Sequence, residues 1–207
     1  MKIASRQYSR SAKAGAFTLI EMIGVLAVIA ILAALLIPKV FEAINNSRIN
    51  NAAVSYNTVK TALTDHYAKY GTILSSNGVA MVVTDTGATN YDKTLLSEAF
   101  LDKPFVVKIG DGTGNHIEAV AGAGVTAVTA INSAYDLDGS GAAVNDANPG
   151  SVVVQAVITG VDENDARDLN NRLDGTALGT TSGADLLGRV KYAGTFPTTV
   201  YIYVNHR

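Results

Sequence analysis

The chain lacks cysteine and has little histidine, which narrows the chemistry open to it. Its 207 residues include no cysteine and only three histidines, His66, His116 and His206. A disulfide, a zinc–thiolate site and a thiol nucleophile are therefore excluded. The histidines lie far apart in the sequence, and no Gly-x-Ser-x-Gly, phosphate-binding loop or His-Glu-x-x-His motif occurs. We identify no candidate catalytic residue and expect the protein not to be an enzyme.

The chain also lacks an excess of positive charge. It has 16 Lys and Arg against 18 Asp and Glu, a formal net charge of −2. Four of the basic side chains stand in the first 16 residues, where no acid occurs: Lys2, Arg6, Arg10 and Lys13. The rest of the chain is therefore more acidic than the total suggests. Because the phosphate backbone of nucleic acids demands a basic surface, we expect no nucleic acid partner.

Charge is nearly absent from the 21 residues between Phe17 and Ile37, where Glu21 is the one ionisable side chain. At about 1.5 Å per residue, a helix of this length spans the roughly 30 Å hydrocarbon core of a bilayer. The basic leader then stays on the cytoplasmic side, and the rest of the chain faces outward. A carboxylate at that depth costs roughly 2.5–3.5 kcal/mol. Glu21 therefore requires a positively charged partner.

Small residues directly precede the apolar segment. A cut between Ala16 and Phe17 would free an α-amino group four residues before Glu21, and such an amine is positively charged near neutral pH. It could pair with Glu21 of an adjacent copy. In an ordinary secretory signal the small-residue cleavage site follows the apolar stretch, so the order is inverted here. An uncleaved signal anchor agrees with the length of the segment but does not explain Glu21.

Residues 15–42 resemble the N-terminus of type IV prepilins and of type II secretion pseudopilins. In that family a prepilin peptidase removes the leader, the new N-terminus is methylated, and the fifth mature residue is glutamate. The resemblance implies cleavage between Ala16 and Phe17, N-methylation of Phe17 and an assembly role for Glu21. The family usually has glycine before the cut, where this chain has Ala16. A cut after Gly15 instead would place Glu21 sixth.

The resemblance implies a structural subunit of a type IV pilus-like or type II secretion pseudopilus filament. Such a subunit is a single-pass inner-membrane protein with a periplasmic head, and it later enters a periplasmic or extracellular filament. Its partners are copies of itself, the prepilin peptidase, the membrane and an inner-membrane assembly platform. The lack of a cysteine pair leans toward a pseudopilin, because many pilin heads carry a C-terminal disulfide loop. A singly anchored envelope domain that binds a glycan or calcium remains the alternative.

Pro38 either ends the membrane helix or lies within a longer one, as is common in the family. Apolar residues recur every three or four positions from Ile44 to Tyr70, which favours continuation. Gly71 is a suitable C-terminal cap. We therefore divide the chain into a cleaved leader (1–16), an N-terminal helix (17–71, of which 17–37 is the transmembrane segment or filament core) and a globular head (72–207).

The remainder predicts an α+β fold, in which the long helical stalk packs against a small, mainly antiparallel β-sheet head. Alternating or continuous apolar runs bounded by turn residues predict its strands. The expected strands are 79–84, 105–109, 116–120, 125–131, 151–161, 189–193 and 198–204, of which 105–109 and 116–120 would form a hairpin. The expected helices are 94–100 and a second one that Asp162 caps and that ends near Asp174.

One acidic loop offers candidate metal ligands. Asp136 and Asp138 alternate beside Gly139, and Asp146 follows. Calcium takes six to eight hard oxygen ligands, which such carboxylates can supply. Some pseudopilins hold calcium in a head loop, so the resemblance keeps calcium as a hypothesis. The EF-hand pattern fails, because its first and last ligand positions carry no carboxylate, and a solvated Asp-Gly turn is the simpler interpretation. We expect no other cofactor.

Overall fold

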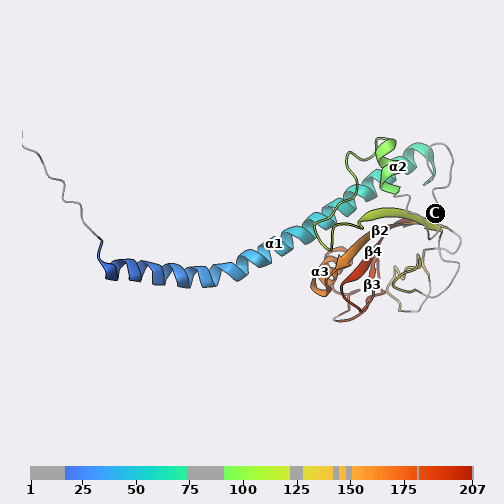
Figure 1. Cartoon of the computed structure of the whole chain (residues 1–207). Helices are drawn as coiled ribbons and strands as arrows, with labels where there is room; N and C mark the ends of the chain where they lie inside the picture. The colour runs from blue at the N-terminus through green and yellow to red at the C-terminus, as the bar shows by residue number, and fades with distance from the viewer. Residues whose placement is uncertain are drawn as a thin grey trace, which may run out of the picture. The chain divides into compact units, whose positions relative to one another are not determined.

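The computed structural model describes residues 17–73, 91–121, 128–141, 145–147, 151–180 and 182–206 (Figure 1). The chain divides into two compact units, Met1–Ala43 and Ile44–Arg207. The elements in order are α1 (Leu19–Tyr70), α2 (Tyr91–Ser97), β1 (His116–Ala121), β2 (Val152–Val161), α3 (Glu163–Leu173), β3 (Val190–Tyr192) and β4 (Thr198–His206).

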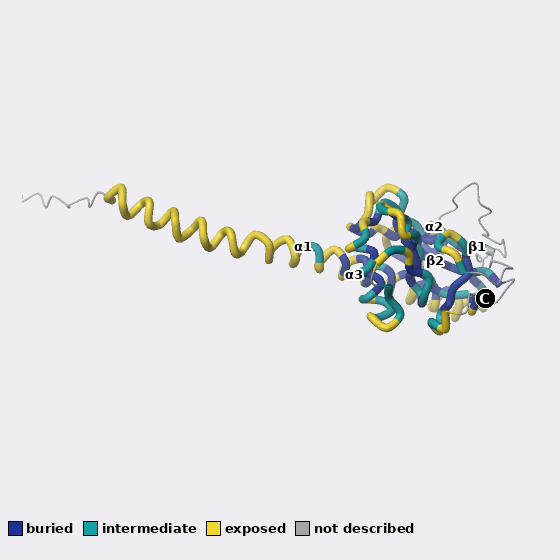
Figure 2. Tube along the Cα trace, turned by 90° about the horizontal axis from the view of Figure 1, so that it is seen from below, coloured by how far each residue is buried: buried dark blue, intermediate teal, exposed yellow. Residues whose placement is uncertain are grey.

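Helix α1 confirms the predicted long N-terminal helix and continues through Pro38. Its N-terminal part has no buried face, whereas its C-terminal part buries one stripe at helical spacing (Figure 2). That stripe consists of Ile49, Ala52, Ala53, Tyr56, Val59, Ala62, Leu63 and His66. The change follows the sequence, because polar residues alternate with apolar ones only after the first 40 residues or so. The second half of α1 therefore belongs to the core of the head.

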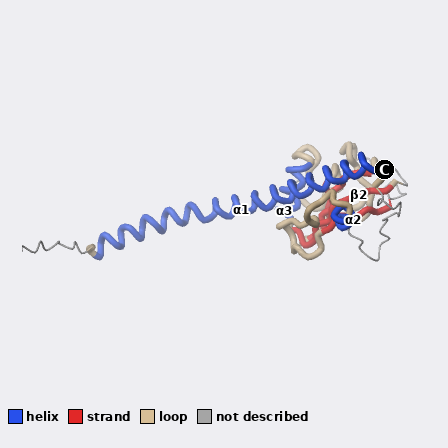
Figure 3. The backbone as a smooth tube through the Cα atoms, turned by 90° about the horizontal axis from the view of Figure 1, so that it is seen from above, coloured by secondary structure: helices blue, strands red, loops and turns tan. Residues whose placement is uncertain are grey.

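The head contains a four-stranded antiparallel sheet of order β1-β2-β4-β3. Figure 3 draws its strands in red. The mostly apolar β2 lies inside it, as expected for the strand with the longest buried run. One face of the sheet packs on α1, and the Tyr56 hydroxyl donates to the Tyr203 carbonyl at 2.8 Å. Helix α2 contacts β1 and α3 contacts β3, so the two short helices lie at opposite edges. The α+β prediction is confirmed.

One predicted strand is absent from the sheet. The segment 105–109 does not form a strand with β1, although Phe105, Val107 and Ile109 are buried as alternation predicts. Its backbone bonds to side chains instead, because the Phe105 N–H donates to Asp92 and the Val107 carbonyl accepts from Asn115. β2 takes the place of 105–109 as the partner of β1.

The start of α3 and one further strand also need correction. Asp162 occupies the N-cap position but makes no side-chain cap hydrogen bond, so its side chain does not cap the helix as predicted. Residues 128–131 of the expected strand 125–131 do not form a strand, and residues 130 and 131 lie in a turn. Residues 125–127, and the whole expected strand 79–84, lie outside the described residues. Helix α2 begins three residues before the predicted start at Thr94.

Candidate functional site

The first turn of α1 places Glu21 against Thr18. The Glu21 carboxylate accepts hydrogen bonds from the Thr18 backbone N–H at 2.8 Å and from the Thr18 hydroxyl at 2.7 Å. The Glu21 N–H donates to the Thr18 Oγ1 at 3.3 Å, and the Met22 N–H donates to the Thr18 carbonyl. This reciprocal arrangement is a capping box, in which a Thr N-cap and a Glu three residues later satisfy otherwise unpaired N–H groups.

The capping box gives Glu21 a local partner that the sequence interpretation missed. The Thr-x-x-Glu spacing of Thr18 and Glu21 was the signal that could have revealed it. The box also fixes where the helix begins. Phe17, which the sequence predicts to be the new N-terminus, precedes the helix and is 82% exposed. The other predicted processing residues, Gly15 and Ala16, lie outside the described residues.

The helix beyond this box presents apolar side chains in every direction. All residues from Leu19 to Ile37 are exposed within the chain, and Glu21 is the one charged side chain among them. By length and composition, α1 is the one helix of the described part that could cross a membrane. A helix that is apolar all round has no solvent-facing side, so its stable surroundings are lipid or other apolar helices.

The acidic loop brings the three predicted metal ligands together. Three carboxylate oxygens lie within 4.8 Å of one another, one each from Asp136, Asp138 and Asp146. Three carboxylates form a donor set that suits a hard cation such as calcium. Backbone N–H groups of the same loop already donate to all three carboxylates, and the N–H of Ser140 lowers the pKa of Asp138. The three carboxylates could thus hold a cation, but the hydrogen bonds to them also stabilise the loop without one.

The structure also pairs each of two histidines with a glutamate. Buried His66 on α1 lies 2.7 Å from the carboxylate of Glu98, which follows α2. On β1 the His116 Nε2 lies 3.7 Å from Glu118, whose other oxygen accepts from Gln155 at 2.6 Å. The first pair joins residues 32 positions apart, which no local pattern could reveal.

No family model, curated protein or solved structure matches the chain. The fold and the site define an α+β protein whose N-terminal helix is long and apolar enough to span a membrane. Within its apolar surface, one carboxylate lies at the helix start.

Proposed function

We propose that the protein is a filament subunit that assembles through its N-terminal helix. The observation that carries the proposal is the exposed apolar surface of α1, which leads into a head that buries its own core. In the membrane, lipid would cover this surface. In the filament, the helices of neighbouring copies would cover it. A repeated head-to-tail contact that does not close into a ring generates a helical fibre. Pilus and pseudopilus filaments both agree with this arrangement.

Glu21 sets the alignment of the subunits in this proposal. Cleavage between Ala16 and Phe17 would place a positively charged amine at the helix start of each copy. Among packed apolar helices, an unpaired carboxylate is strongly unfavourable, while pairing with an ammonium offsets much of the desolvation cost. Only an axial offset that joins Glu21 to the amine of a neighbour satisfies both groups. An assembly role for Pro38 stays a prediction from the resemblance.

The capping box provides a matched set of variants for this proposal. Glutamine can replace glutamate in a capping box, so Glu21→Gln keeps the cap and loses only the charge. Thr18→Ala does the reverse, because it removes the N-cap and leaves the carboxylate. We expect Glu21→Gln and Glu21→Ala to insert into the membrane but to yield at least tenfold fewer filaments in a shearing assay. Thr18→Ala should retain most of the wild-type yield.

Three outcomes would contradict this account. Normal filament yield from Glu21→Gln would show that the residue acts as a helix cap and not as a charge. Loss of filaments from Thr18→Ala alone would point the same way. A wild-type chain that stays monomeric in the membrane, while its head binds a glycan or calcium, would favour the anchored envelope domain over a filament subunit.

A further inference from the structure

Lys191 is the one buried lysine of the described part of the chain. It stands in β3 between Val190 and Tyr192, which belong to the core that includes α1. Because side chains alternate across a strand, Lys191 points to the other face of the sheet, where it is fully buried. Burying an ammonium is costly unless hydrogen bonds satisfy it. This group therefore needs acceptors beneath the surface.

Four oxygen atoms of one turn surround the ammonium. Lys191 donates to the carbonyls of Thr129 at 3.1 Å, Ala134 at 2.8 Å and Asn132, and the Asn132 Oδ1 lies 3.2 Å from Nζ. The centre of the Tyr135 ring lies 4.2 Å from the same nitrogen. Among the described residues no carboxylate forms an ion pair with Lys191. Neutral oxygens and an aromatic face thus offset the cost of burying this charge.

The turn that supplies these oxygens belongs to no helix or strand. The Asn132 Oδ1 closes it by accepting from the N–H groups of Thr129 at 3.2 Å and Ala134 at 3.1 Å. Carbonyl oxygens carry partial negative charge, so those that converge on one point repel one another unless a cation lies between them. Proteins use convergent backbone carbonyls in this way to replace the hydration shell of a monovalent cation.

The ammonium fastens this turn to the edge of the sheet. Strand β3 is an edge strand that pairs with β4. Just before β3, the Gly188 N–H donates to the Asp136 carbonyl at 2.7 Å, and Leu187 forms an isolated bridge with Asp136. Lys191 extends these contacts to residues 129–134 through its side chain. Residues 129–136 are therefore attached to the chain at and before β3.

We propose that residues 129–134 form a binding site for a monovalent cation, which the chain fills with its own ammonium group. Lys191 thereby orders this turn as a bound ion orders other irregular loops. Once the lysine is cut back to alanine, the site accepts a free primary ammonium ion of the missing length. That ion is n-propylammonium, because alanine keeps Cβ and the ion supplies the remaining three carbons and the nitrogen.

Hydrogen exchange followed by mass spectrometry tests the site in the full-length chain in detergent. Burial lowers the pKa of Lys191 to about 7, so the ammonium form predominates at pH 6, where the exchange is measured. We expect Lys191→Ala and Lys191→Met to speed exchange in residues 129–137 by about tenfold or more, because buried carbonyls lose a charged donor. Methionine keeps an unbranched apolar chain and loses the charge. Strands β1 and β2 should keep their protection.

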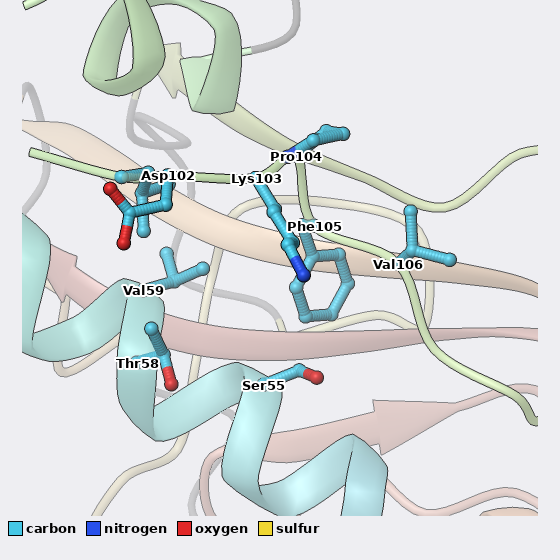
Figure 4. A pocket seen from close by; sticks show the side chains of 9 residues that line it. Ser55, Thr58, Val59, Asp102, Lys103, Pro104, Phe105 and Val106 are labelled. Atoms are coloured by element: carbon cyan, nitrogen blue, oxygen red, sulfur yellow. The ribbon is translucent and has the colours of Figure 1, made fainter. Parts of the chain in front are cut away.

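Added n-propylammonium should bring exchange in Lys191→Ala back to within about threefold of wild type, because it binds the folded state. It should not act on Lys191→Met, whose side chain still fills the channel. 1-Propanol has the same shape without the charge, and tetramethylammonium has the charge without an N–H donor, so neither should act. Lys103, an exposed lysine, lines a groove beside α1 (Figure 4), and Lys103→Ala should exchange like wild type.

A measurement on the wild-type chain covers the case in which Lys191→Ala does not fold. In protein labelled with 15N-lysine at pH 6, an ammonium buried among carbonyls exchanges its protons slowly and gives a resonance that exposed lysines do not show. We expect one such resonance, and we expect it to be absent from Lys191→Met.

The results separate a cation site from ordinary packing. Rescue of Lys191→Ala by n-propylammonium alone supports the proposal. Wild-type exchange in Lys191→Met would show that the apolar stem holds the turn and would overturn it. Equal rescue by 1-propanol, or no rescue of a folded Lys191→Ala chain by n-propylammonium, would also overturn it. The same holds if the wild-type chain shows no slowly exchanging ammonium.

Discussion

At the scale of single residues, the His116–Glu118 pair makes the stability of the head depend on pH. The carboxylate of Glu118, 3.7 Å away, raises the pKa of His116 above its ordinary value of 6.5. Burial alone would raise the pKa of Glu118, but the nearby His116 and the hydrogen bond from Gln155 outweigh it and lower that pKa below 4.5. At pH values between these two pKa values both groups are charged, so the pair stabilises the head most in that range.

The two groups make the stability of the head depend on pH in opposite directions. The stabilisation from His116 is complete below about pH 6.5 and is lost as pH rises through its folded pKa. The stabilisation from Glu118 is complete above about pH 4.5 and is lost as pH falls through its folded pKa. We therefore expect the difference in Tm between wild type and His116→Gln to be greatest near pH 5.5 and to shrink toward pH 8. A difference that stays constant over pH 5–8 would show that the ion pair contributes nothing.

The acidic loop gives a second prediction at this scale. Three carboxylates held within 4.8 Å repel one another, and a divalent cation would relieve that repulsion. At a tenfold excess over its Kd, calcium would stabilise the head by about 1.4 kcal/mol, or a Tm shift of roughly 3–5 °C. Exposed Asp138 is the test residue, because Asp138→Asn should abolish the shift and change the calcium-free Tm little. An unchanged wild-type Tm in calcium would leave the loop as a hydrogen-bonded turn.

The sequence predicts that the three aspartates lie close together, but it does not predict the contacts of Lys191. Asp136, Asp138 and Asp146 are close in the chain around glycines, so their convergence was predictable. The contacts of Lys191 with residues 129–134 span about 60 positions. They depend on the order of strands in the sheet, which no local pattern specifies.

At the scale of the element, the two faces of the C-terminal half of α1 should respond differently to substitution. Leu63 is buried in the core of the head, whereas Val54 is exposed on the same helix. We expect Leu63→Ala to lower the free energy of unfolding by about 2–5 kcal/mol, because it removes buried methyl groups and leaves a cavity. Val54→Ala, the matched control, should change it by less than about 0.5 kcal/mol. Denaturant unfolding of the full chain in detergent measures both values.

Equal effects of the two substitutions would contradict the packing of α1 on the sheet.

Helix α1 was the element that the sequence predicted most completely. Its apolar positions recur at helical spacing over many turns. The segment 105–109 was predicted less well. Phe105, Val107 and Ile109 are buried, as on one face of a strand, but the predicted pairing with β1 fails because β2 occupies that edge of β1.

At the scale of the whole molecule, the proposed function places one apolar helix and one folded head in two surroundings. The helix would have to be stable in lipid and, in the proposed filament, among its own copies. A single carboxylate is tolerable in the first only at the membrane edge, and in the second only beside a positive charge. Processing before Phe17 would supply that charge to every subunit.

The most direct test is a high-resolution structure of the intact filament. The account predicts that each chain begins at Phe17, and that the α-amino nitrogen of Phe17 lies within about 4 Å of the Glu21 carboxylate of an adjacent subunit, a salt-bridge distance. Chains that still carry residues 1–16, or an amine and a carboxylate of neighbouring copies too far apart for any direct or water-bridged contact, would contradict it.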